Sequence, residues 1–320
     1  MTKPVVLIPG SIYEHVVKRV DADFEMLRID SADLKLLSDT QRAQIKGIAS
    51  AIHLPNDFIK ELPSLEIIAH FGVGYDVIDA KFAGENNVMV CNTPDVLSEE
   101  VADTTIGLLL NTLRELPKAE AHIRNGDWVG KGNYRLTPLT MRNRTVGIYG
   151  LGRIGQEIAK RLEGFGVEIH YHTRTEKSGF SYKYHSTLLD MANAVDTLIS
   201  IVPGTSATTK SINAEILKAL GSDGVFINVG RGSVADEDAL IEALQNKTIA
   251  AAGLDVFENE PDPRKDFFTL DNVSVLPHVA SASVHTRNAM GDLQVDNLVN
   301  WFSGKAPISP VPETAHIATK

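Results

Sequence analysis

The sequence predicts an α/β protein made of two doubly wound domains, each built on a parallel β-sheet. Short runs rich in Val and Ile alternate with segments of helical period along nearly the whole chain, which is typical of βαβ units. These runs fall into two series, which one long amphipathic segment separates. A length of 320 residues also suits two domains better than one.

The first series lies in the first hundred residues. Its expected strands are Pro4–Pro9, Lys46–Ile52, Leu65–Phe71 and Asn87–Cys91. Helical segments such as Asp57–Leu62 lie between them. The amphipathic segment that follows is expected to be a helix from Ser98 to about Arg124, with Ser98 as its N-cap. The turn sequence Asn125–Asp127 is expected to end this helix.

The second series supplies enough strands for a complete sheet. The expected strands are Arg144–Gly150, Val167–His172, Thr197–Pro203, Gly224–Gly230, Ile249–Phe257 and Val273–Val279. Six strands complete a doubly wound sheet. The last helical segment, Asn288–Phe302, therefore does not connect two strands of this second sheet. We expect it to pack back on the first domain. Residues 100–285 then form a domain inserted into a discontinuous one, residues 1–99 plus 286–320.

The composition and charge of the chain indicate which binding partners and which cellular location to expect. The net charge of −10 and the pI of about 5.5 argue against a nucleic-acid partner. No apolar run reaches the length of a membrane span, and the start of the chain lacks the layout of a signal peptide. The single cysteine, Cys91, cannot form an internal disulfide. These features predict a cytoplasmic protein without a membrane partner. No His spacing of the H-E-x-x-H kind occurs, so no metal is expected.

The turn after the first strand of the second series carries a dinucleotide-binding pattern. Gly150, Gly152 and Gly155 have G-x-G-x-x-G spacing between an expected strand and an expected helix. The three positions allow a tight turn, close approach of a pyrophosphate and close helix packing. The helix N-terminus near Arg153 favours the phosphates. We therefore expect the cofactor to contact this turn, including Leu151, Arg153 and Ile154.

The end of the next strand indicates which dinucleotide binds. NAD sites commonly place Asp or Glu there, about 20 residues beyond the glycines, to bind the ribose hydroxyls. In this chain the position falls at His172 or Thr173, and neither is acidic. Arg174 follows and can pair with phosphate oxygens, and the hydroxyls of Thr173 and Thr175 can add hydrogen bonds. The sequence therefore predicts a 2′-phosphate site, with NADPH preferred and NADH possible. A solvated basic turn is the alternative.

Four polar residues follow later strands of the second series. They are Arg231, Asp255, Glu260 and His278. Ligands of an open parallel sheet lie beyond the carboxyl ends of its strands, where these residues are expected. Each of these residues, taken alone, is also consistent with an ordinary loop residue that has no role in a site. Together they suit one redox site.

Longer motifs connect these positions to a known family. The runs 228–240 (NVGRGSVADEDAL), 251–261 (AAGLDVFENEP) and 276–290 (LPHVASASVHTRNAM) follow the glycine turn in order. The runs 70–79 (HFGVGYDVID) and 91–105 (CNTPDVLSEEVADTT) precede it. The chain resembles the D-isomer-specific 2-hydroxyacid dehydrogenase family over nearly its whole length. The resemblance implies an oxidoreductase with a Rossmann-type cofactor domain inserted into a discontinuous, flavodoxin-like substrate domain.

The resemblance also implies a catalytic set, namely Arg231, Glu260 and His278. His278 is expected to protonate the carbonyl oxygen of a 2-oxo acid while the cofactor delivers hydride. Glu260 is expected to bind the other ring nitrogen of His278 and stabilise the imidazolium. Arg231 is expected to bind the substrate and polarise its carbonyl group. Arg231 and His278 thus both contact the substrate.

Further contacts are expected around this set. The resemblance assigns the nicotinamide carboxamide to Asp255, a cofactor contact to Thr104, and the substrate carboxylate to the backbone amides of Val73 and Gly74. Ser50 and Ala51 are expected in the loop that lines the substrate pocket. The remaining expected cofactor contacts are Val202, Pro203, Thr208, Val229, Gly230 and Ala280.

The leading hypothesis is an NADPH-dependent reductase of glyoxylate, hydroxypyruvate or a similar short 2-oxo acid. The alternatives are an NAD-linked dehydrogenase for a bulkier D-2-hydroxy acid and a non-catalytic, dinucleotide-sensing interaction protein. The resemblance implies a homodimer. The segment Asn125–Met141 agrees, since Trp128, Tyr134 and Leu136 give it more apolar surface than a free loop should expose.

Overall fold

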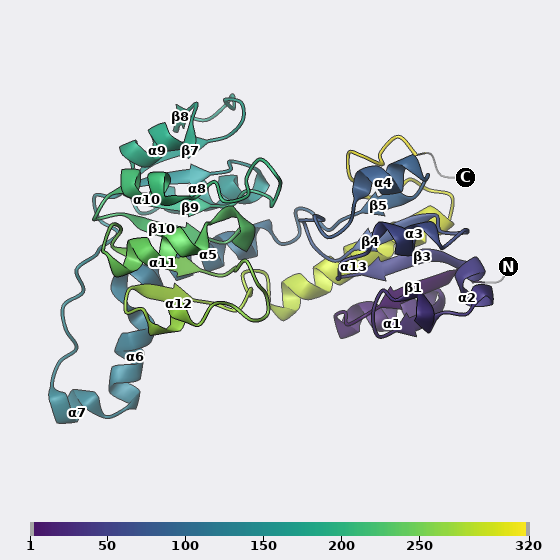
Figure 1. Cartoon of the computed structure of the whole chain (residues 1–320), viewed down its shortest axis with the longest axis horizontal. Helices are drawn as coiled ribbons and strands as arrows, with labels where there is room; N and C mark the ends of the chain where they lie inside the picture. Colours follow the sequence, from purple (N-terminus) through teal and green to yellow (C-terminus); the bar gives the residue numbers. More distant parts are fainter. Residues whose placement is uncertain (1–2, 318–320) are drawn as a thin grey trace. The chain divides into compact units, whose positions relative to one another are not determined.

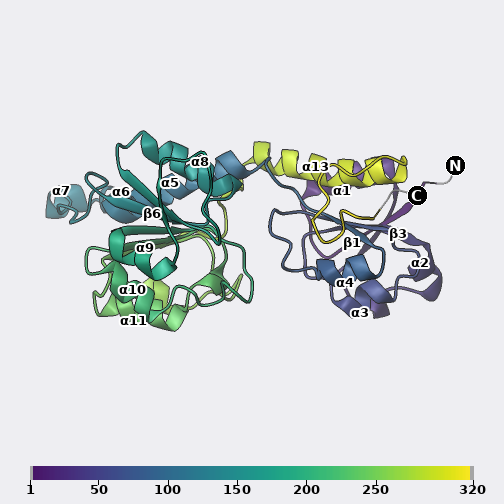
Figure 2. The same cartoon turned by 90° about the horizontal axis from the view of Figure 1, so that it is seen from above.

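The structure is a computed structural model that describes residues 3–317. The chain divides into two compact units, one formed by Met1–Leu97 with Ala282–Lys320 and the other by Ser98–Ser281. Each unit contains a fully parallel sheet with helices on both faces (Figures 1 and 2). The predicted fold class is confirmed. None of the described helices is long and apolar enough to cross a membrane.

The first unit holds a five-stranded sheet in the order β2-β1-β3-β4-β5. Its strands are β1 (Val5–Pro9), β2 (Glu25–Ile29), β3 (Ile45–Ser50), β4 (Ile67–His70) and β5 (Met89–Cys91). The prediction of four strands is wrong because it omits β2. This strand pairs with β1 alone and has no fully buried side chain, so it lacks the continuous apolar run of the central strands.

The helices of the first unit cover both faces of this sheet. They are α1 (Glu14–Asp23), α2 (Asp39–Gln44), α3 (Asn56–Lys60), α4 (Ala80–Glu85) and α13 (Val284–Phe302). Helix α13 packs on α1, β3 and β4, as expected for the C-terminal helix (Figure 2). It begins four residues before the predicted start, with Ser283 as its N-cap. The Gln294 side chain donates to the backbone carbonyls of Ser50 and Ala69, which ties α13 to the sheet.

The second unit holds a seven-stranded sheet in the order β12-β11-β10-β9-β6-β7-β8. Its strands are β6 (Thr145–Tyr149), β7 (Glu168–His172), β8 (Lys183–His185), β9 (Thr197–Ser200), β10 (Val225–Asn228), β11 (Ala251–Leu254) and β12 (Val273–Val275). The prediction of six strands is wrong because it omits β8, a three-residue edge strand without a buried side chain. Strands β9 to β12 also end earlier than predicted, so the polar residues lie in the loops that follow them.

Two layers of helices cover the seven-stranded sheet (Figure 2). The helices are α5 (Ser98–Arg114), α6 (Leu116–Arg124), α7 (Asp127–Lys131), α8 (Arg153–Glu163), α9 (Leu188–Ala194), α10 (Ala214–Leu220), α11 (Glu237–Gln245) and α12 (Asp266–Thr269). One core cluster joins α5 and α8 to the sheet, through residues such as Leu109 and Ile158. The other joins α9, α10 and α11, through residues such as Leu217 and Leu240. These layers fix the strand ends that carry the polar residues.

The long amphipathic segment differs from the prediction in two details. It forms two helices, because Glu115 has a left-handed backbone (φ 51°) between α5 and α6. Ser98 is the first residue of α5 instead of its N-cap, and its buried hydroxyl has no hydrogen-bond partner among the described residues. The predicted cap is therefore wrong. The predicted end is confirmed, since Asn125 is the C-cap of α6.

Candidate active site

A histidine and a carboxylate form a hydrogen-bonded pair at the carboxyl ends of the strands of the seven-stranded sheet. The Nδ1 atom of His278 lies 2.7 Å from Oε2 of Glu260. The other oxygen of Glu260 accepts a hydrogen bond from the Phe257 N–H at 2.9 Å. Both carboxylate oxygens are therefore engaged, and the imidazole is held with Nδ1 toward Glu260. The Nε2 atom is left as the ring position that can exchange a proton with a bound molecule.

The backbone of His278 is held in a conformation that few residues adopt. Its φ is 51°, in the left-handed region, which costs a side-chain-bearing residue roughly 1 kcal/mol or more. The His278 N–H donates to the Asp255 carbonyl at 2.8 Å. This bond helps to hold the histidine in position. Such strained positions cluster at functional sites, which agrees with a catalytic role.

The charge state of Glu260 follows from its contacts. Burial on its own raises the pKa of Glu260, but the hydrogen bonds from His278 and the Phe257 N–H outweigh it, together with the positive charge of Arg231. The pKa of Glu260 is therefore lower than usual, so the group is a carboxylate at neutral pH. The side chains of His278 and Glu260 are 48% and 34% exposed, which leaves the pair accessible to a small molecule.

Arg231 follows β10 and is positioned by a close contact between two loops. Its carbonyl accepts a hydrogen bond from the Asn228 side chain at 3.0 Å, and its Nη1 donates to the Gly230 carbonyl at 3.0 Å. The next residue, Gly232, packs against Phe257 so tightly that a Cβ there would lie 1.8 Å from the Phe257 carbonyl carbon. The structure thus brings Arg231, Glu260 and His278 together at one edge of the sheet.

Asp255 connects β11 to the segment that follows His278. It is fully buried, and its two carboxylate oxygens accept hydrogen bonds from Val279 N–H at 2.8 Å and Ala280 N–H at 3.0 Å. Burial raises the pKa of Asp255, and the two N–H groups offset part of this rise. The Thr104 hydroxyl donates to the Ala280 carbonyl at 3.1 Å. Asp255 and Thr104 therefore both help to position the loop that carries His278.

The glycine turn has the shape that a dinucleotide requires. Gly150 has a φ of 105°, and a Cβ there would lie 2.9 Å from the Ile201 carbonyl oxygen. A Cβ on Gly155 would lie 2.1 Å from the Gly150 oxygen, so α8 can approach the turn only with glycine there. A Cβ on Gly152 would meet nothing within 4 Å. The backbone at Gly152 is thus open, next to the N-terminus of α8, and it fits a pyrophosphate group.

The loops beside the turn hold most of the remaining predicted cofactor residues. The Thr208 hydroxyl donates to the Pro203 carbonyl at 2.6 Å, which closes the loop after β9. A Cβ on Gly230 would lie 2.8 Å from the Val202 oxygen, so the loops after β9 and β10 touch. The α5–α8 core cluster instead contains or contacts the side chains of Leu151, Ile154 and Val229. Any contact between these three residues and a cofactor would therefore come from their backbone.

The end of β7 carries cationic and hydroxyl groups. The Gly150 N–H donates to the His172 carbonyl at 3.0 Å, which places the strand end beside the glycine turn. The Thr173 hydroxyl donates to the Thr175 carbonyl at 2.7 Å. Arg174 is exposed, and none of the described residues pairs with its guanidinium. Glu168 lies at the other end of β7, where it binds His170 at 2.8 Å. Neither His172, the last residue of β7, nor Thr173, which follows it, is a carboxylate.

The predicted substrate residues lie in the first unit, at the end of β3 and in the loops after β3 and β4. Val73 and Gly74 are half-buried in the loop after β4. The hydroxyl of Ser50 is buried and hydrogen-bonded to the Ile52 backbone, so it shapes its own turn, while the next residue, Ala51, is half-buried.

The match to a known protein family lies in the second unit. The family model described as D-isomer specific 2-hydroxyacid dehydrogenase, NAD binding domain, matches residues 106–280, which is more than half of the chain. This chain belongs to the D-isomer-specific 2-hydroxyacid dehydrogenase family. The resemblance noted in the sequence is thereby confirmed.

Several members of the family match nearly the whole chain. The crystal structure of an NADPH-dependent glyoxylate/hydroxypyruvate reductase from Sinorhizobium meliloti, in complex with NADP and malonate, is 57% identical, with 98% of each chain covered and a TM-score of 0.96. Glyoxylate/hydroxypyruvate reductase A HPR2 of Arabidopsis thaliana is 42% identical, covering 96% of this chain and 98% of the relative. Glyoxylate reductase of Pyrococcus horikoshii is 35% identical, with 95% of each chain covered.

Two residues that the sequence did not single out hold the loop after β4. The Asn92 side chain donates to the Val73 carbonyl at 2.8 Å, and the Thr93 N–H donates to the Gly72 carbonyl at 2.9 Å. Both residues directly follow β5, which pairs with β4. Both residues lie at the carboxyl end of the strand next to β4. This position in the sequence could have identified them as residues that support the substrate loop.

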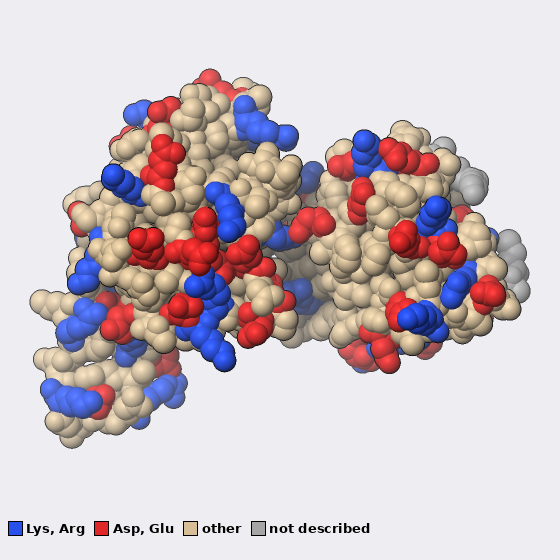
Figure 3. Space-filling view, in the orientation of Figure 1, with Lys and Arg blue, Asp and Glu red and all other residues tan. Residues whose placement is uncertain are grey.

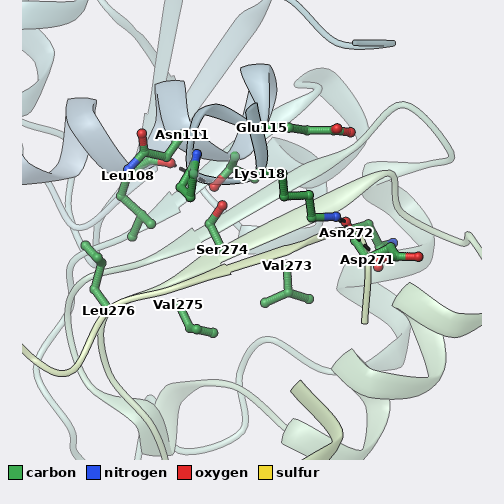
Figure 4. A pocket seen from close by; sticks show the side chains of 12 residues that line it. Leu108, Asn111, Glu115, Lys118, Asp271, Asn272, Val273, Ser274, Val275 and Leu276 are labelled. Carbon is green, nitrogen blue, oxygen red and sulfur yellow. Dashed lines mark hydrogen bonds and ion pairs between the residues drawn. The ribbon is translucent and has the colours of Figure 1, made fainter. Parts of the chain in front are cut away.

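A groove in the second unit lies away from the strand ends that carry the catalytic set. It has a volume of about 200 Å³ and runs along edge strand β12, between this strand and helices α5 and α6 (Figure 4). Val273, Val275 and Leu276 line one side, and Leu108 and Lys118 are on the other. None of the predicted site residues lines this groove.

Proposed function

We propose that this protein is an NADPH-dependent reductase that converts a short 2-oxo acid, such as glyoxylate or hydroxypyruvate, to the 2-hydroxy acid, with D configuration where the product has a stereocentre. The observation that carries the proposal is the Glu260–His278 pair, 2.7 Å apart, at the strand edge that also carries Arg231. The names of the relatives support the substrate class, and the NADP complex of the 57% identical reductase supports the cofactor.

His278 is the proposed general acid. When bound, NADPH supplies hydride to the carbonyl carbon of the 2-oxo acid. The protonated Nε2 of His278 gives its proton to the carbonyl oxygen, so the product is a hydroxyl group and a neutral imidazole. Glu260 accepts a hydrogen bond from Nδ1–H throughout, which fixes the tautomer and stabilises the imidazolium before the transfer.

Arg231 and the loop after β4 are the proposed substrate contacts. The guanidinium of Arg231 is proposed to bind the carboxylate or the carbonyl oxygen and to stabilise the charge that develops on that oxygen. The backbone amides of Val73 and Gly74 are proposed to donate to the substrate carboxylate. A 2-oxo acid without a bulky side chain offers these groups a carboxylate and an adjacent carbonyl oxygen, which are the two features that the proposal needs.

Steady-state reduction by the purified protein tests this proposal. Oxidation of NADPH is followed by absorbance with glyoxylate, hydroxypyruvate and, as a control that lacks the carboxylate, glycolaldehyde. We expect turnover with the two acids, a product from hydroxypyruvate of D configuration, and a far lower kcat/KM with the aldehyde. His278→Ala should lower kcat by about 10²–10⁴ with little change in NADPH affinity. Turnover by this variant at the wild-type rate would remove His278 from the mechanism.

We also propose that the protein is a homodimer in the cytoplasm. The arm formed by residues 116–140 exposes apolar side chains, among them Trp128 (56%), Val129 (97%) and Leu136 (95%). Figure 3 shows uncharged atoms over much of this arm, at α7, with several Lys and Arg side chains among them. Apolar surface of this kind favours association with a second copy. The single buried cysteine, Cys91, supports a reducing compartment.

Light scattering at micromolar concentration tests the oligomeric state. We expect the mass of a dimer for the wild-type protein and a shift toward the monomer for Leu136→Asp, because the substitution places a charge on an apolar position that is 95% exposed in the single chain. The control is Phe268→Asp, at an exposed apolar residue (58%) outside the arm, which should leave the dimer intact. A monomeric wild-type protein would refute this part of the proposal.

A further inference from the structure

The C-terminal tail, residues 304–317, lies along the edge of the five-stranded sheet. Strand β5 is at this edge, and the tail forms an antiparallel bridge to it between Pro310 and Cys91. The Val311 N–H donates to the Val90 carbonyl at 2.9 Å. Both neighbours of Val311 are prolines, which have no N–H to offer a further strand. The tail therefore pairs with β5 and closes the sheet on this side.

Two further contacts fix the backbone of the tail at Glu313. The next residue, Thr314, is fully buried, and its hydroxyl accepts from the Val90 N–H at 3.1 Å. A Cβ on Gly84 of α4 would lie 2.9 Å from the Glu313 carbonyl oxygen, so α4 and the tail are in close contact (Figure 1, tail in yellow). The exposed carboxylate of Glu313 accepts from the Tyr75 hydroxyl at 3.1 Å.

Tyr75 belongs to the loop after β4, which also carries the amides of Val73 and Gly74. Burial raises the pKa of Tyr75 to about 12, together with the negative charge of Glu313. The Tyr75 hydroxyl is therefore protonated and donates to the carboxylate throughout the neutral range. Through this bond the tail holds the loop on the C-terminal side of the two amides.

A second connection from the tail reaches the same loop through buried groups. Ser309 is 9% exposed, and its hydroxyl donates to the Asn92 carbonyl at 2.7 Å. The same hydroxyl accepts from the Asn297 side chain of α13 at 2.9 Å. The Asn92 side chain in turn donates to the Val73 carbonyl at 2.8 Å. A continuous chain of hydrogen bonds thus runs from α13 through the tail to the loop.

The loop itself has little that fixes its shape. Gly72 and Gly74 flank Val73, and glycine restricts the backbone less than any other residue does. Within residues 3–317, neither the Val73 N–H nor the Gly74 N–H donates a hydrogen bond to the protein. The contacts from Asn92 and from the tail to Tyr75 therefore lie on either side of two amides that are available to a ligand.

We propose that Ser309 and Glu313 of the C-terminal tail are positioning residues for substrate binding. They act through Asn92 and Tyr75, respectively, and hold the two amides of the loop in the orientation that a carboxylate needs. This inference rests on the proposed function, in which these amides bind the carboxylate of the 2-oxo acid. Donors that are already ordered lose less conformational entropy on binding, so they bind the anion more tightly. The tail thus affects binding of the acid group, and not hydride or proton transfer.

Steady-state kinetics with glyoxylate, hydroxypyruvate and glycolaldehyde test the Tyr75–Glu313 contact. Tyr75→Phe removes the donor and Glu313→Ala removes the acceptor. Each should raise KM for the two acids by up to about fivefold, as expected for a charged hydrogen bond that solvent screens, with kcat unchanged. The low kcat/KM for glycolaldehyde, which has no carboxylate, should stay the same. The double variant should be no worse than either single variant, because both remove the same bond.

Two more variants complete the test. Glu313→Gln keeps an oxygen that can accept from Tyr75, so it should recover most of the wild-type KM for the acids. Ser309→Ala interrupts the second connection and should also raise this KM without changing kcat/KM for glycolaldehyde. Combined with Asn92→Ala, it should add little, since Ser309 acts through Asn92.

The matched control is a second Tyr–Glu pair, which lies in the other unit. Glu163 accepts from the Tyr182 hydroxyl at 2.7 Å, and Glu163→Ala should keep all wild-type kinetic constants. Unchanged KM values for the acids in both Tyr75→Phe and Ser309→Ala would overturn the inference. So would equal losses with the acids and with glycolaldehyde, because a general disturbance of the fold does not depend on the carboxylate. A wild-type protein that reduces neither acid would instead refute the proposed function.

Discussion

The negative charge on Glu260 should support the proposed proton donation by His278. Replacing Glu260 with Gln keeps a side chain of the same shape and an oxygen that can accept from Nδ1–H of His278. It removes the negative charge that lies 2.7 Å from that ring. Since His278 must be protonated to donate, loss of the carboxylate should weaken the donor form of the ring and lower kcat/KM for the 2-oxo acid.

The size of the loss follows from the exposure of the pair. A hydrogen bond to a charged group contributes about 1.5–3 kcal/mol. The two side chains are 48% and 34% exposed, so solvent screening reduces the value to about 1–1.5 kcal/mol. This corresponds to a loss of about tenfold in kcat/KM.

The assay is kcat/KM for glyoxylate at saturating NADPH and neutral pH. The matched control is Glu258→Gln, an exposed carboxylate of the same loop, which should keep the wild-type kcat/KM. The second oxygen of Glu260 also binds the Phe257 N–H, so part of the loss in Glu260→Gln comes from the loop. An unchanged kcat/KM in Glu260→Gln would refute the electrostatic argument.

Three further substitutions test separate parts of the proposed site. Arg231→Ala should raise KM for 2-oxo acids and lower kcat, together about 1.5–3 kcal/mol in kcat/KM, and an effect confined to cofactor affinity would move Arg231 out of the substrate site. Arg174→Ala should weaken NADPH by about tenfold and leave NADH unchanged, while equal losses of both affinities would contradict a 2′-phosphate contact. Asn92→Ala frees the Val73 carbonyl and should raise KM for the 2-oxo acid more than it lowers kcat. An unchanged KM would mean that the loop keeps its shape without this bond.

The strands that the sequence did not reveal lie at the edges of the two sheets. Strands β2 and β8 each pair with one neighbour, and neither has a fully buried side chain. The central strands are buried on both faces and therefore appear as continuous apolar runs. An edge strand such as Lys183–His185 has no comparable pattern, because it is stabilised mainly by pairing with β7. Prediction from periodicity fails where the sheet, and not the apolar content of the segment, determines the structure.

The break in the long helical segment has a similar cause. Glu115 interrupts the helix, and its carboxylate accepts hydrogen bonds from the Tyr134 hydroxyl at 2.7 Å and from Arg135 at 2.6 Å. These partners come from the end of the arm, about twenty residues further along the chain. Glu is an ordinary helix-forming residue, so the sequence around it gives no reason to end a helix there. Contacts that are distant in sequence determine this backbone conformation.

The catalytic set shows where sequence reasoning succeeds and where it stops. Polar residues just after parallel strands predict the edge at which Glu260 and His278 meet, because the topology brings all strand ends to one side. The family resemblance assigns Asp255 to the cofactor, yet the structure shows both of its oxygens on the backbone of residues 279 and 280. With the Asp255 carbonyl also holding the His278 N–H, three hydrogen bonds from this one residue fix a histidine with left-handed φ. The position of His278 thus depends on a buried carboxylate 23 residues earlier in the sequence (278 − 255), a coupling that no local pattern contains.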